Sequence, residues 1–330
     1  MNRTKILIIR FSSIGDIVLT TPIVRALKNC VKNVELHYLT KPENETLLKN
    51  NKYIDKLHLL KNDLSETTDE LSKEEFGYVV DLQKNLRSLR IKKALGVRVS
   101  SFPKLNIRKW LFVNLKLQCM PAIHIVDRYF EAVRDLEVVN DGKGLDYFLQ
   151  EADFVDCETL PAGFQSGYVA CVVGSKHATK QMPTDLMADL CRKIQKPIIL
   201  LGGKGDRDKA AIIGQQVGAK VFNACGNYNI NQSAYLVKNA LGIITPDTGL
   251  MHIAAAFDKN IIAVWGNTVP QFGMYPYRAV NAKGKTYNFE VKNLHCRPCS
   301  KLGYAECPKK HFRCMLGQDT DKIAEIANAW

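Results

Sequence analysis

Two aspartates stand where an apolar run passes into a small, polar, helix-compatible segment. Asp16 follows the run KILIIR at residues 5–10, and Asp247 follows LGIIT and is itself followed by Thr248 and Gly249. A carboxylate that is partly desolvated and within reach of a hydroxyl can act as a general base. A helix that begins at such a junction also presents unpaired N–H groups, which favour phosphate. The alternative at each junction is a helix cap without chemistry, because aspartate is a preferred N-cap residue.

Two lysines lie in a third polar loop, GSKHATKQ at residues 174–181, which follows the apolar run 168–173. The ammonium group of Lys176 or Lys180 could join backbone N–H groups in binding a phosphate. The patterns G-x-G-x-x-G and G-x-x-x-x-G-K-[ST] are absent, and so is a G-x-S-x-G elbow. The sequence therefore gives no case for a dehydrogenase or a P-loop ATPase.

These loops belong to two series in which strands alternate with helices. Apolar runs predict strands at 5–10, 34–38, 56–60, 76–82, 168–173, 196–201, 220–223, 241–245 and 261–265. Helical spacing predicts helices at 17–28, 83–95, 122–136, 206–217, 231–239, 250–257 and from 184 onward. Such alternation predicts βαβ crossovers and mostly parallel sheets, so the fold class is α/β. Pro22 lies inside the first predicted helix and either begins it or kinks it.

The length of 330 residues favours two domains. Polar, irregular sequence near residues 153–164 predicts the boundary, which gives an N-terminal domain at 1–157, a C-terminal domain at 158–318 and a closing helix at 319–330. No apolar run is long enough to span a membrane, and residues 6–9 are too short for the core of a signal peptide. We therefore expect a cytoplasmic protein whose ten cysteines are thiols or metal ligands.

The net charge of +13 is concentrated in one interval that we call the basic block. Between Asp81 and Asp127 there is no acidic residue, and the interval carries Lys84, Arg87, Arg90, Lys92, Lys93, Arg98, Lys104, Arg108, Lys109 and Lys116. Such a block indicates a polyanionic partner, whereas a solvated helix face usually mixes both signs. Aromatic residues within the block are sparse, which disfavours stacking on nucleic acid bases.

The C-terminal region holds four cysteines with the spacing Cys-x2-Cys-x7-Cys-x6-Cys, namely Cys296, Cys299, Cys307 and Cys314. Four thiolates could bind a structural Zn²⁺ tetrahedrally, although these intervals are not those of a standard zinc finger. The alternatives are reduced thiols or a labile disulfide.

Three segments together resemble glycosyltransferase family 9, the ADP-heptose:lipopolysaccharide heptosyltransferases. They are KILIIRFSSIGDIVLTTP at the N-terminus, GSKHATKQMP in the centre and TPDTGLMHIAAAF farther on. The resemblance implies a GT-B-like fold, with two Rossmann-like domains facing a central cleft. It implies inverting transfer of a heptose from ADP-heptose to a lipopolysaccharide core acceptor, with no cofactor and no catalytic metal.

The resemblance also implies roles for individual residues. Asp16 would be the general base, and Arg87 and Arg128 would bind the acceptor. With Lys176 added from its loop, the donor-binding residues would be Ser175, Lys176, Lys180, Asp206, Asp247, Thr248, Gly249 and His252. Asp206 would lie near the ribose hydroxyls, with Asp208 as the competing residue. Met182 stands where the family often has tryptophan, a departure that bears on the nucleotide base.

The expected partners are a nucleotide sugar, a phosphorylated lipid-linked saccharide and the anionic inner face of the inner membrane, which the basic block suits. Nucleic acid is not expected. Two other classes remain open from the residues. One is a different GT-B-fold enzyme on nucleotide sugars, such as an epimerase or a hydrolase. The other is a non-catalytic binder of a membrane surface or nucleic acid.

Overall fold

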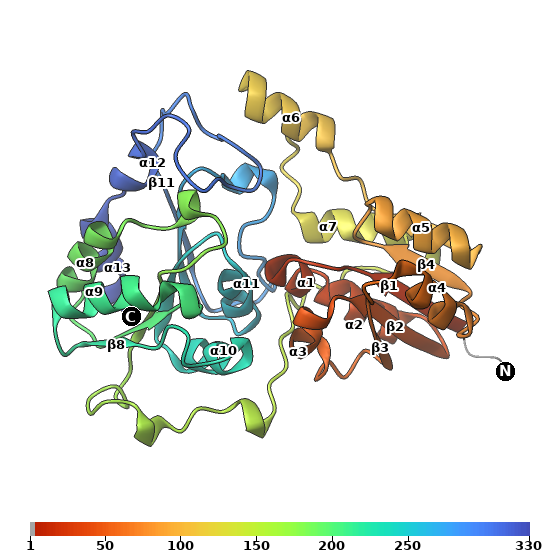
Figure 1. Ribbon diagram of the computed structural model, residues 1–330, viewed down its shortest axis with the longest axis horizontal. Coiled ribbons are helices and arrows are strands. Elements are labelled where there is room, and N and C mark those ends of the chain that lie inside the picture. The colour runs from red at the N-terminus through yellow and green to blue at the C-terminus, as the bar shows by residue number, and fades with distance from the viewer. Residues whose placement is uncertain (1–3) are drawn as a thin grey trace. The chain divides into compact units, whose positions relative to one another are not determined.

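The computed structural model describes residues 4–330, which form two compact units. Unit 1 runs through Lys104 and also contains Ile123–Phe148 and Tyr277–Asn281, whereas unit 2 contains Leu105–Ala122, Leu149–Pro276 and Ala282–Trp330. Each unit is built on one sheet with helices packed on it (Figure 1). The units differ from the predicted single boundary after residue 157, because residues 105–122 contact unit 2 and residues 277–281 contact unit 1.

Unit 1 contains a five-stranded sheet in the order β3-β2-β1-β4-β5, and every neighbouring pair is parallel. Its strands are β1 (Thr4–Ile9), β2 (Val34–Thr40), β3 (Lys56–Leu59), β4 (Tyr78–Asp81) and β5 (Arg98–Ser101). Its helices are α1 (Ile14–Val18), α2 (Thr21–Cys30), α3 (Glu45–Leu48), α4 (Leu64–Ser72), α5 (Leu86–Leu95) and α7 (Ile125–Phe130). The predicted helix 17–28 is therefore two helices, and Pro22 lies in the first turn of α2, where its missing N–H costs nothing.

Both faces of this sheet are covered, which is why its central strands are continuous apolar runs. Along β1, Leu7 and Ile9 face one core that includes Leu71 of α4 and Ile91 of α5. Ile6 and Ile8 point to the opposite face, because side chains alternate along a strand, and they are also fully buried.

Unit 2 contains a six-stranded sheet in the order β11-β10-β9-β6-β7-β8, again parallel throughout. Its strands are β6 (Val169–Val172), β7 (Ile198–Leu201), β8 (Val221–Asn223), β9 (Gly242–Pro246), β10 (Asn260–Trp265) and β11 (Thr286–Glu290). Its helices are α6 (Asn106–Leu115), α8 (Thr184–Lys193), α9 (Arg207–Val217), α10 (Ile230–Asn239), α11 (Gly249–Ala256), α12 (Arg313–Leu316) and α13 (Thr320–Asn328).

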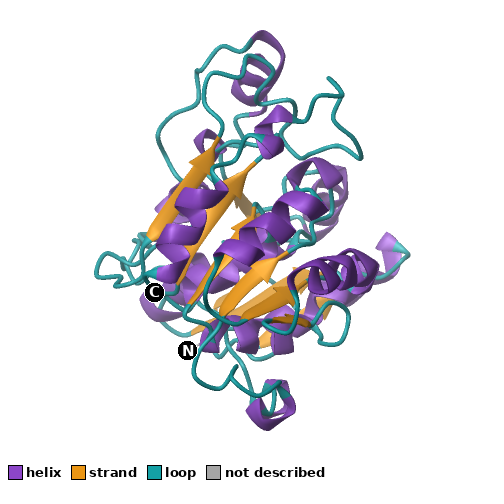
Figure 2. Cartoon of the chain, turned by 90° about the vertical axis from the view of Figure 1, so that its left-hand side faces the viewer, coloured by secondary structure: helices purple, strands orange, loops and turns teal. Residues whose placement is uncertain are grey.

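Helices α8, α9 and α13 pack side by side and share one core with β6, β7 and the neighbouring strands, while α10 packs against α11 (Figure 2). The predicted closing helix is α13, and it docks on α8 as part of unit 2. Met182 is buried in this core. No helix in the described part of the chain combines the length and the apolar character that a membrane span requires.

One buried arginine holds an irregular segment of unit 1 in place. Arg25 of α2 is 2% exposed and donates to both carboxylate oxygens of Asp141, at 2.8 Å each. The same guanidinium donates to the Gly144 carbonyl oxygen at 2.8 Å and pairs with Asp146. Segment 141–146 has no regular secondary structure, so these bonds are a large part of what fixes it to the helix.

We expect Arg25→Met to lower the free energy of unfolding by about 3 kcal/mol, the lower end of the range for breaking a buried ion pair. The lower end applies because Asp141 and Asp146 keep some contact with solvent. Arg134→Met is the matched control: Arg134 forms an exposed pair with Glu131, and its loss should cost less than about 1 kcal/mol. Urea unfolding followed by circular dichroism measures both values. Equal effects in the two variants would show that Arg25 does not anchor the segment.

Candidate functional site

In each unit, the predicted functional loops leave adjacent strands at the point where the strand order reverses. In unit 2, β6 is followed along the chain by β7 on one side, and β9 pairs with β6 on the other side. In unit 1 the corresponding strands are β1 and β4. Ligands of open parallel sheets bind outside the carboxyl ends of the strands at such switch points.

The loops after β6 and β9 of unit 2 are joined by an ion pair. Lys180 Nζ lies 2.7 Å from Asp247 Oδ2, and both side chains are mostly buried. Thr268, in the loop after β10, donates its hydroxyl to the same carboxylate oxygen at 3.1 Å. Three neighbouring loops therefore meet at one carboxylate. Because an ammonium group has three donors, Lys180 can hold Asp247 and bind an anion at the same time.

Helix α11 begins at this point. Thr248 is its N-cap, and the Thr248 hydroxyl lies 3.0 Å from that of Thr245 instead of capping the helix. The first N–H groups of the helix, from Gly249 onward, are thus not satisfied by the cap side chain, and the positive end of the helix dipole lies beside Lys180. His252, one turn into the helix, is buried at 2% exposure.

The other predicted donor residues in the loops after β6 and β7 differ in their contacts and exposure. Asp206 accepts a hydrogen bond from the Gly203 backbone N–H at 2.8 Å and lies so close to Gly174 that a side chain there would collide with its carboxylate. The Ser175 carbonyl oxygen accepts from Gln181 Nε2 at 2.8 Å, which fixes the 174–181 loop. Lys176 is exposed, so the structure places Lys180 and not Lys176 in the ion pair.

The cysteine-rich segment is packed on these loops. Arg297 donates to the Gly266 and Thr268 carbonyl oxygens at 2.6 and 3.0 Å, next to the Thr268 hydroxyl that contacts Asp247. The Tyr304 backbone N–H donates to Thr179 Oγ1 at 2.8 Å, one residue before Lys180. The segment therefore braces the loops that hold the ion pair.

Burial raises the pKa of the Cys299 and Cys314 thiols to about 11. Cys296 Sγ lies 3.8 Å from His311 Nε2. Within the described residues, no three of the four sulfur atoms lie within 4.8 Å of one another. A zinc site at Cys296, Cys299, Cys307 and Cys314 stays a prediction from the sequence.

In unit 1, Asp16 is the third residue of α1 and bonds back to its cap. Ser13 donates to Asp16 Oδ2 from its backbone N–H at 3.0 Å and from its hydroxyl at 2.9 Å. Arg10 Nη2 lies 2.6 Å from Asp16 Oδ1, and the Asp16 side chain is 20% exposed. Burial alone would raise the pKa of Asp16, but Arg10 and the Ser13 hydrogen bonds outweigh it and hold this pKa below its usual value.

The loop after β4 completes the edge of unit 1. Arg10 also donates to the Leu82 carbonyl oxygen, and the Phe11 backbone N–H donates to Gln83 Oε1 at 2.9 Å. Asp81, fully buried at the end of β4, pairs with Lys92 of α5 at 2.8 Å. Lys92 of the basic block therefore neutralises a buried carboxylate within unit 1.

The two predicted acceptor residues differ in access. Arg87 lies in the first turn of α5 and is exposed. Arg128 of α7 is only 2% exposed, and burial lowers the pKa of its guanidinium. Because Arg128 is buried and Arg87 is exposed, direct contact with a bulky acceptor is better supported for Arg87.

Sequence reasoning missed Arg10, Gln181 and Thr268. Arg10 and Thr268 both follow predicted strands, at 5–10 and 261–265, and the rule that ligands bind at the carboxyl edge applies to them as much as to Asp247. Gln181 ends the loop that was singled out for its lysines.

Comparison with known proteins places these features in one family. The profile of glycosyltransferase family 9 (heptosyltransferase) matches residues 66–304. The chain is 24% identical over 292 residues to lipopolysaccharide heptosyltransferase 1 of Campylobacter coli, an alignment that covers 80% of this chain and 84% of that protein.

Two solved structures share the fold. The E. coli ADP-heptose lipopolysaccharide heptosyltransferase II has a TM-score of 0.75 at 16% identity, covering 99% of this chain and 98% of that one. E. coli heptosyltransferase WaaC with ADP-2-deoxy-2-fluoro heptose has a TM-score of 0.64 at 18% identity, covering 81% and 90%. The predicted α/β, GT-B-like fold class with two Rossmann-like units is confirmed, and the chain belongs to glycosyltransferase family 9, the heptosyltransferases.

Proposed function

We propose that this glycosyltransferase transfers a heptose from ADP-heptose to a hydroxyl of a phosphorylated, lipid-linked lipopolysaccharide core, with inversion at the anomeric carbon. The observation that carries the proposal is the group formed by Lys180, Asp247 and Thr268 at the N-terminus of α11. Family membership favours transfer over epimerisation, hydrolysis or nucleic acid binding. Turnover of ADP-heptose with and without the acceptor separates transfer from hydrolysis.

The donor half of the proposal assigns the diphosphate to unit 2. Negative charge develops on the leaving diphosphate during transfer, and a preorganised ammonium group with a helix N-terminus stabilises it. Lys180 and the first N–H groups of α11 supply these two elements, so we propose that charge on the leaving diphosphate is stabilised without a catalytic metal. Asp206, fixed against Gly174, is proposed to contact the ribose hydroxyls. The E. coli structures named above support a nucleotide sugar of the ADP-heptose type.

The acceptor half assigns the base to Asp16. An inverting transfer needs one base, because the acceptor hydroxyl attacks the sugar directly and no glycosyl-enzyme forms. Asp16 lies outside the residues that match the family profile, so its role rests on the SSIGD motif and on its position at the switch point of unit 1. Its lowered pKa makes it a weak base that stays ionised, and Arg10 keeps it oriented.

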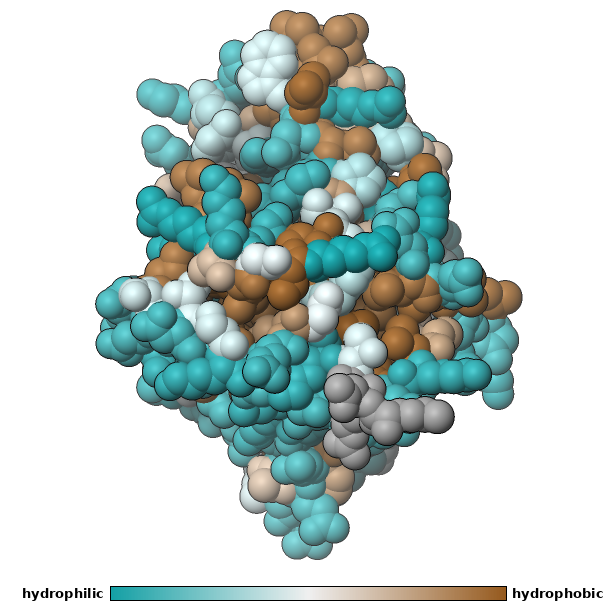
Figure 3. Space-filling model, turned by 90° about the vertical axis from the view of Figure 1, so that its right-hand side faces the viewer, coloured by the Kyte–Doolittle hydropathy of each residue, from teal (hydrophilic) through white to brown (hydrophobic). Residues whose placement is uncertain are grey.

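The basic block supports attachment to an anionic membrane surface. Helix α6 has no buried residue, and its Trp110 is 57% exposed. Helix α5 exposes Leu86, at 76%, together with Arg87 and Arg90. Basic helices with exposed apolar side chains bind at the interface of anionic bilayers. Hydrophobic and hydrophilic surface are interspersed on the face shown in Figure 3. We propose a peripheral location on the cytoplasmic face of the inner membrane.

Replacing Asp16 by Asn should lower kcat by about 10²- to 10⁴-fold, the usual contribution of a general base, while the affinity for donor changes little. Steady-state kinetics and calorimetry with ADP measure the two effects, and circular dichroism checks the fold. In the wild type, a base must be ionised to act, and Arg10 and the Ser13 hydrogen bonds hold the pKa of Asp16 below its usual value, so the carboxylate stays ionised through the weakly acidic range. The kcat/KM profile should therefore show no acidic limb between pH 5 and 7. Near-normal turnover in the variant would leave Asp16 with only its capping role.

Replacing Lys180 by Ala should weaken ADP binding by about 10- to 100-fold, the equivalent of one charge-assisted hydrogen bond, and should reduce turnover as well. Lys180→Arg keeps the charge and should recover part of the affinity. The control is Lys322→Ala, which removes an exposed lysine of α13 whose ammonium group pairs with Glu325. If ADP binds Lys180→Ala as tightly as the wild type, the proposed diphosphate site is wrong.

The triple variant Arg87→Glu, Arg90→Glu, Lys93→Glu should lose binding to vesicles that contain anionic lipid, while ADP binding is retained. The wild-type interaction should weaken with added salt, because exposed charges are screened beyond about 8 Å at physiological ionic strength. Lys92 is left unchanged because it neutralises the buried Asp81. Vesicle co-sedimentation measures binding, and neutral vesicles are the control. Unchanged binding by the variant would show that this part of the block is only a solvated surface.

A further inference from the structure

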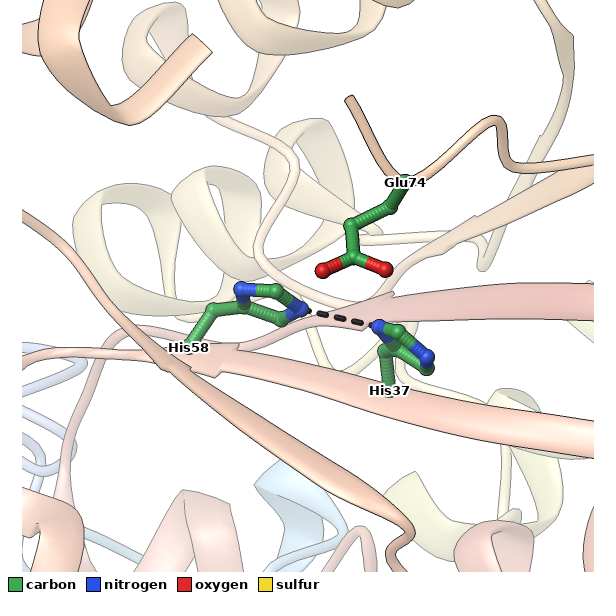
Figure 4. A group of neighbouring side chains, drawn as sticks. All are labelled: His37, His58 and Glu74. Atoms are coloured by element: carbon green, nitrogen blue, oxygen red, sulfur yellow. Dashed lines mark hydrogen bonds between the residues drawn. The ribbon is translucent and has the colours of Figure 1, made fainter. Parts of the chain in front are cut away.

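Two histidines and a glutamate meet on one face of the unit 1 sheet, away from the loops of the candidate site. His37 of β2 and His58 of the edge strand β3 are buried, and Glu74 follows α4. His37 Nδ1 lies 2.8 Å from His58 Nε2, and one ligand atom from each of the three residues lies within 4.8 Å of the others. Figure 4 shows the Glu74 carboxylate directed toward the same two ring nitrogens.

The strand register explains why these side chains share a face. His37 is paired with Lys56, and His58 is paired with Leu39 two residues farther along β2. Paired residues of parallel strands point to the same side, so both imidazoles face the connection from α4 to β4. Lys5 and Lys56, which also contact Glu74, lie near the amino ends of β1 and β3. The group is therefore at the opposite end of the sheet from Asp16.

Each imidazole has a carboxylate on its far side. His37 Nε2 lies 2.9 Å from Glu35 Oε1, and His58 Nδ1 lies 3.8 Å from Glu70 Oε1. A histidine that binds a metal usually donates its other N–H to a carboxylate, which fixes the tautomer and leaves the lone pair for the metal. The arrangement at His37, with its N–H toward Glu35, leaves the Nδ1 lone pair pointing toward His58.

The metal-free arrangement leaves one buried atom unsatisfied. If His58 donates its Nε2–H to His37 Nδ1, the His58 Nδ1 atom carries a lone pair, and in the structure this buried atom has no hydrogen-bond partner. A cation between the rings removes that defect. It takes the lone pair of His58 Nε2, and the ring proton then lies on Nδ1, facing Glu70.

We propose that His37, His58 and Glu74 bind a divalent transition-metal ion of the zinc class, which ties edge strand β3 to β2 and to the end of α4. Two imidazoles and one carboxylate are a common zinc ligand set, with a fourth position left for water. Glu74 is suited to the role because its carboxylate places an oxygen within 4.8 Å of a ring nitrogen of each histidine (Figure 4).

Two lysines compete with the metal for Glu74. Lys5 Nζ lies 3.2 Å from Glu74 Oε2, and Lys56 pairs with Oε1. The Lys56 side chain is 52% exposed, so it can turn into solvent when a cation arrives. Removing its charge should therefore strengthen metal binding, which is an effect that a misfolded variant cannot imitate.

The test is titration of the full-length, chelator-treated chain with Zn²⁺ by calorimetry, together with zinc X-ray absorption to identify the ligand atoms. We expect binding with nitrogen and oxygen ligands and a higher melting temperature with Zn²⁺, because a ligand of the folded state stabilises it. Glu74→Gln should weaken this binding by at least about 10-fold, and Lys56→Ala should tighten it. Glu66→Gln, which changes an exposed residue of α4, is the control for lost charge.

Zinc bound by the tail cysteines is distinguished by its sulfur ligands, because Glu74→Gln would leave a sulfur component in place and remove only the nitrogen and oxygen component. Absence of Zn²⁺ binding, binding through sulfur alone, or unchanged affinity in both Glu74→Gln and Lys56→Ala would overturn the proposal. Circular dichroism of each variant checks that it is folded. If Glu74→Gln does not fold, the zinc affinity of Lys56→Ala decides whether the proposed site exists.

Discussion

The burial of a parallel sheet on both faces is the constraint on which the rest of this protein depends. The central strands β1 and β9 carry apolar side chains along most of their length, so the polar groups of the candidate site lie in the loops at the strand ends. At the carboxyl edges the loops supply carboxylates, lysines and helix N-termini, and these groups neutralise one another within each unit. The ion pairs Arg10–Asp16 in unit 1 and Lys180–Asp247 in unit 2 both form at these edges.

The sequence alone predicted the strands that are buried on both faces of a sheet. Runs such as KILIIR and LGIIT are buried on both sides, and the strands lie where those runs predict them. Strands β5 and β11 were not predicted, because they lie at sheet edges, are only partly buried and have no apolar run. Helix α6 was also not predicted, and none of its residues is buried.

The candidate site was predictable in position but not in its pairings. The junction at Asp247 and the lysines of the 174–181 loop were visible as strand-to-helix signals, whereas the choice of Lys180 over Lys176 depends on how the loop is fixed by Gln181 and Tyr304. Likewise, no local pattern shows that Arg10 would lower the pKa of Asp16, because the side-chain directions at a loop depend on packing. The His37 and His58 contact was equally hidden, since it depends on the register between two strands.

The last segment of unit 1, Tyr277–Asn281, is synthesised well after the rest of that unit. Tyr277 accepts a hydrogen bond from Asn140 at 2.6 Å and donates to Asp127 at 2.7 Å, and the Val280 backbone N–H donates to the Gly142 carbonyl oxygen at 2.9 Å. These contacts join residues that are made more than a hundred positions apart. At about 5–20 residues per second, the ribosome delivers the closing segment on the order of ten seconds after residue 148. During that interval the nascent N-terminal unit has its whole sheet but lacks its last contacts, while most of the second unit is still being made.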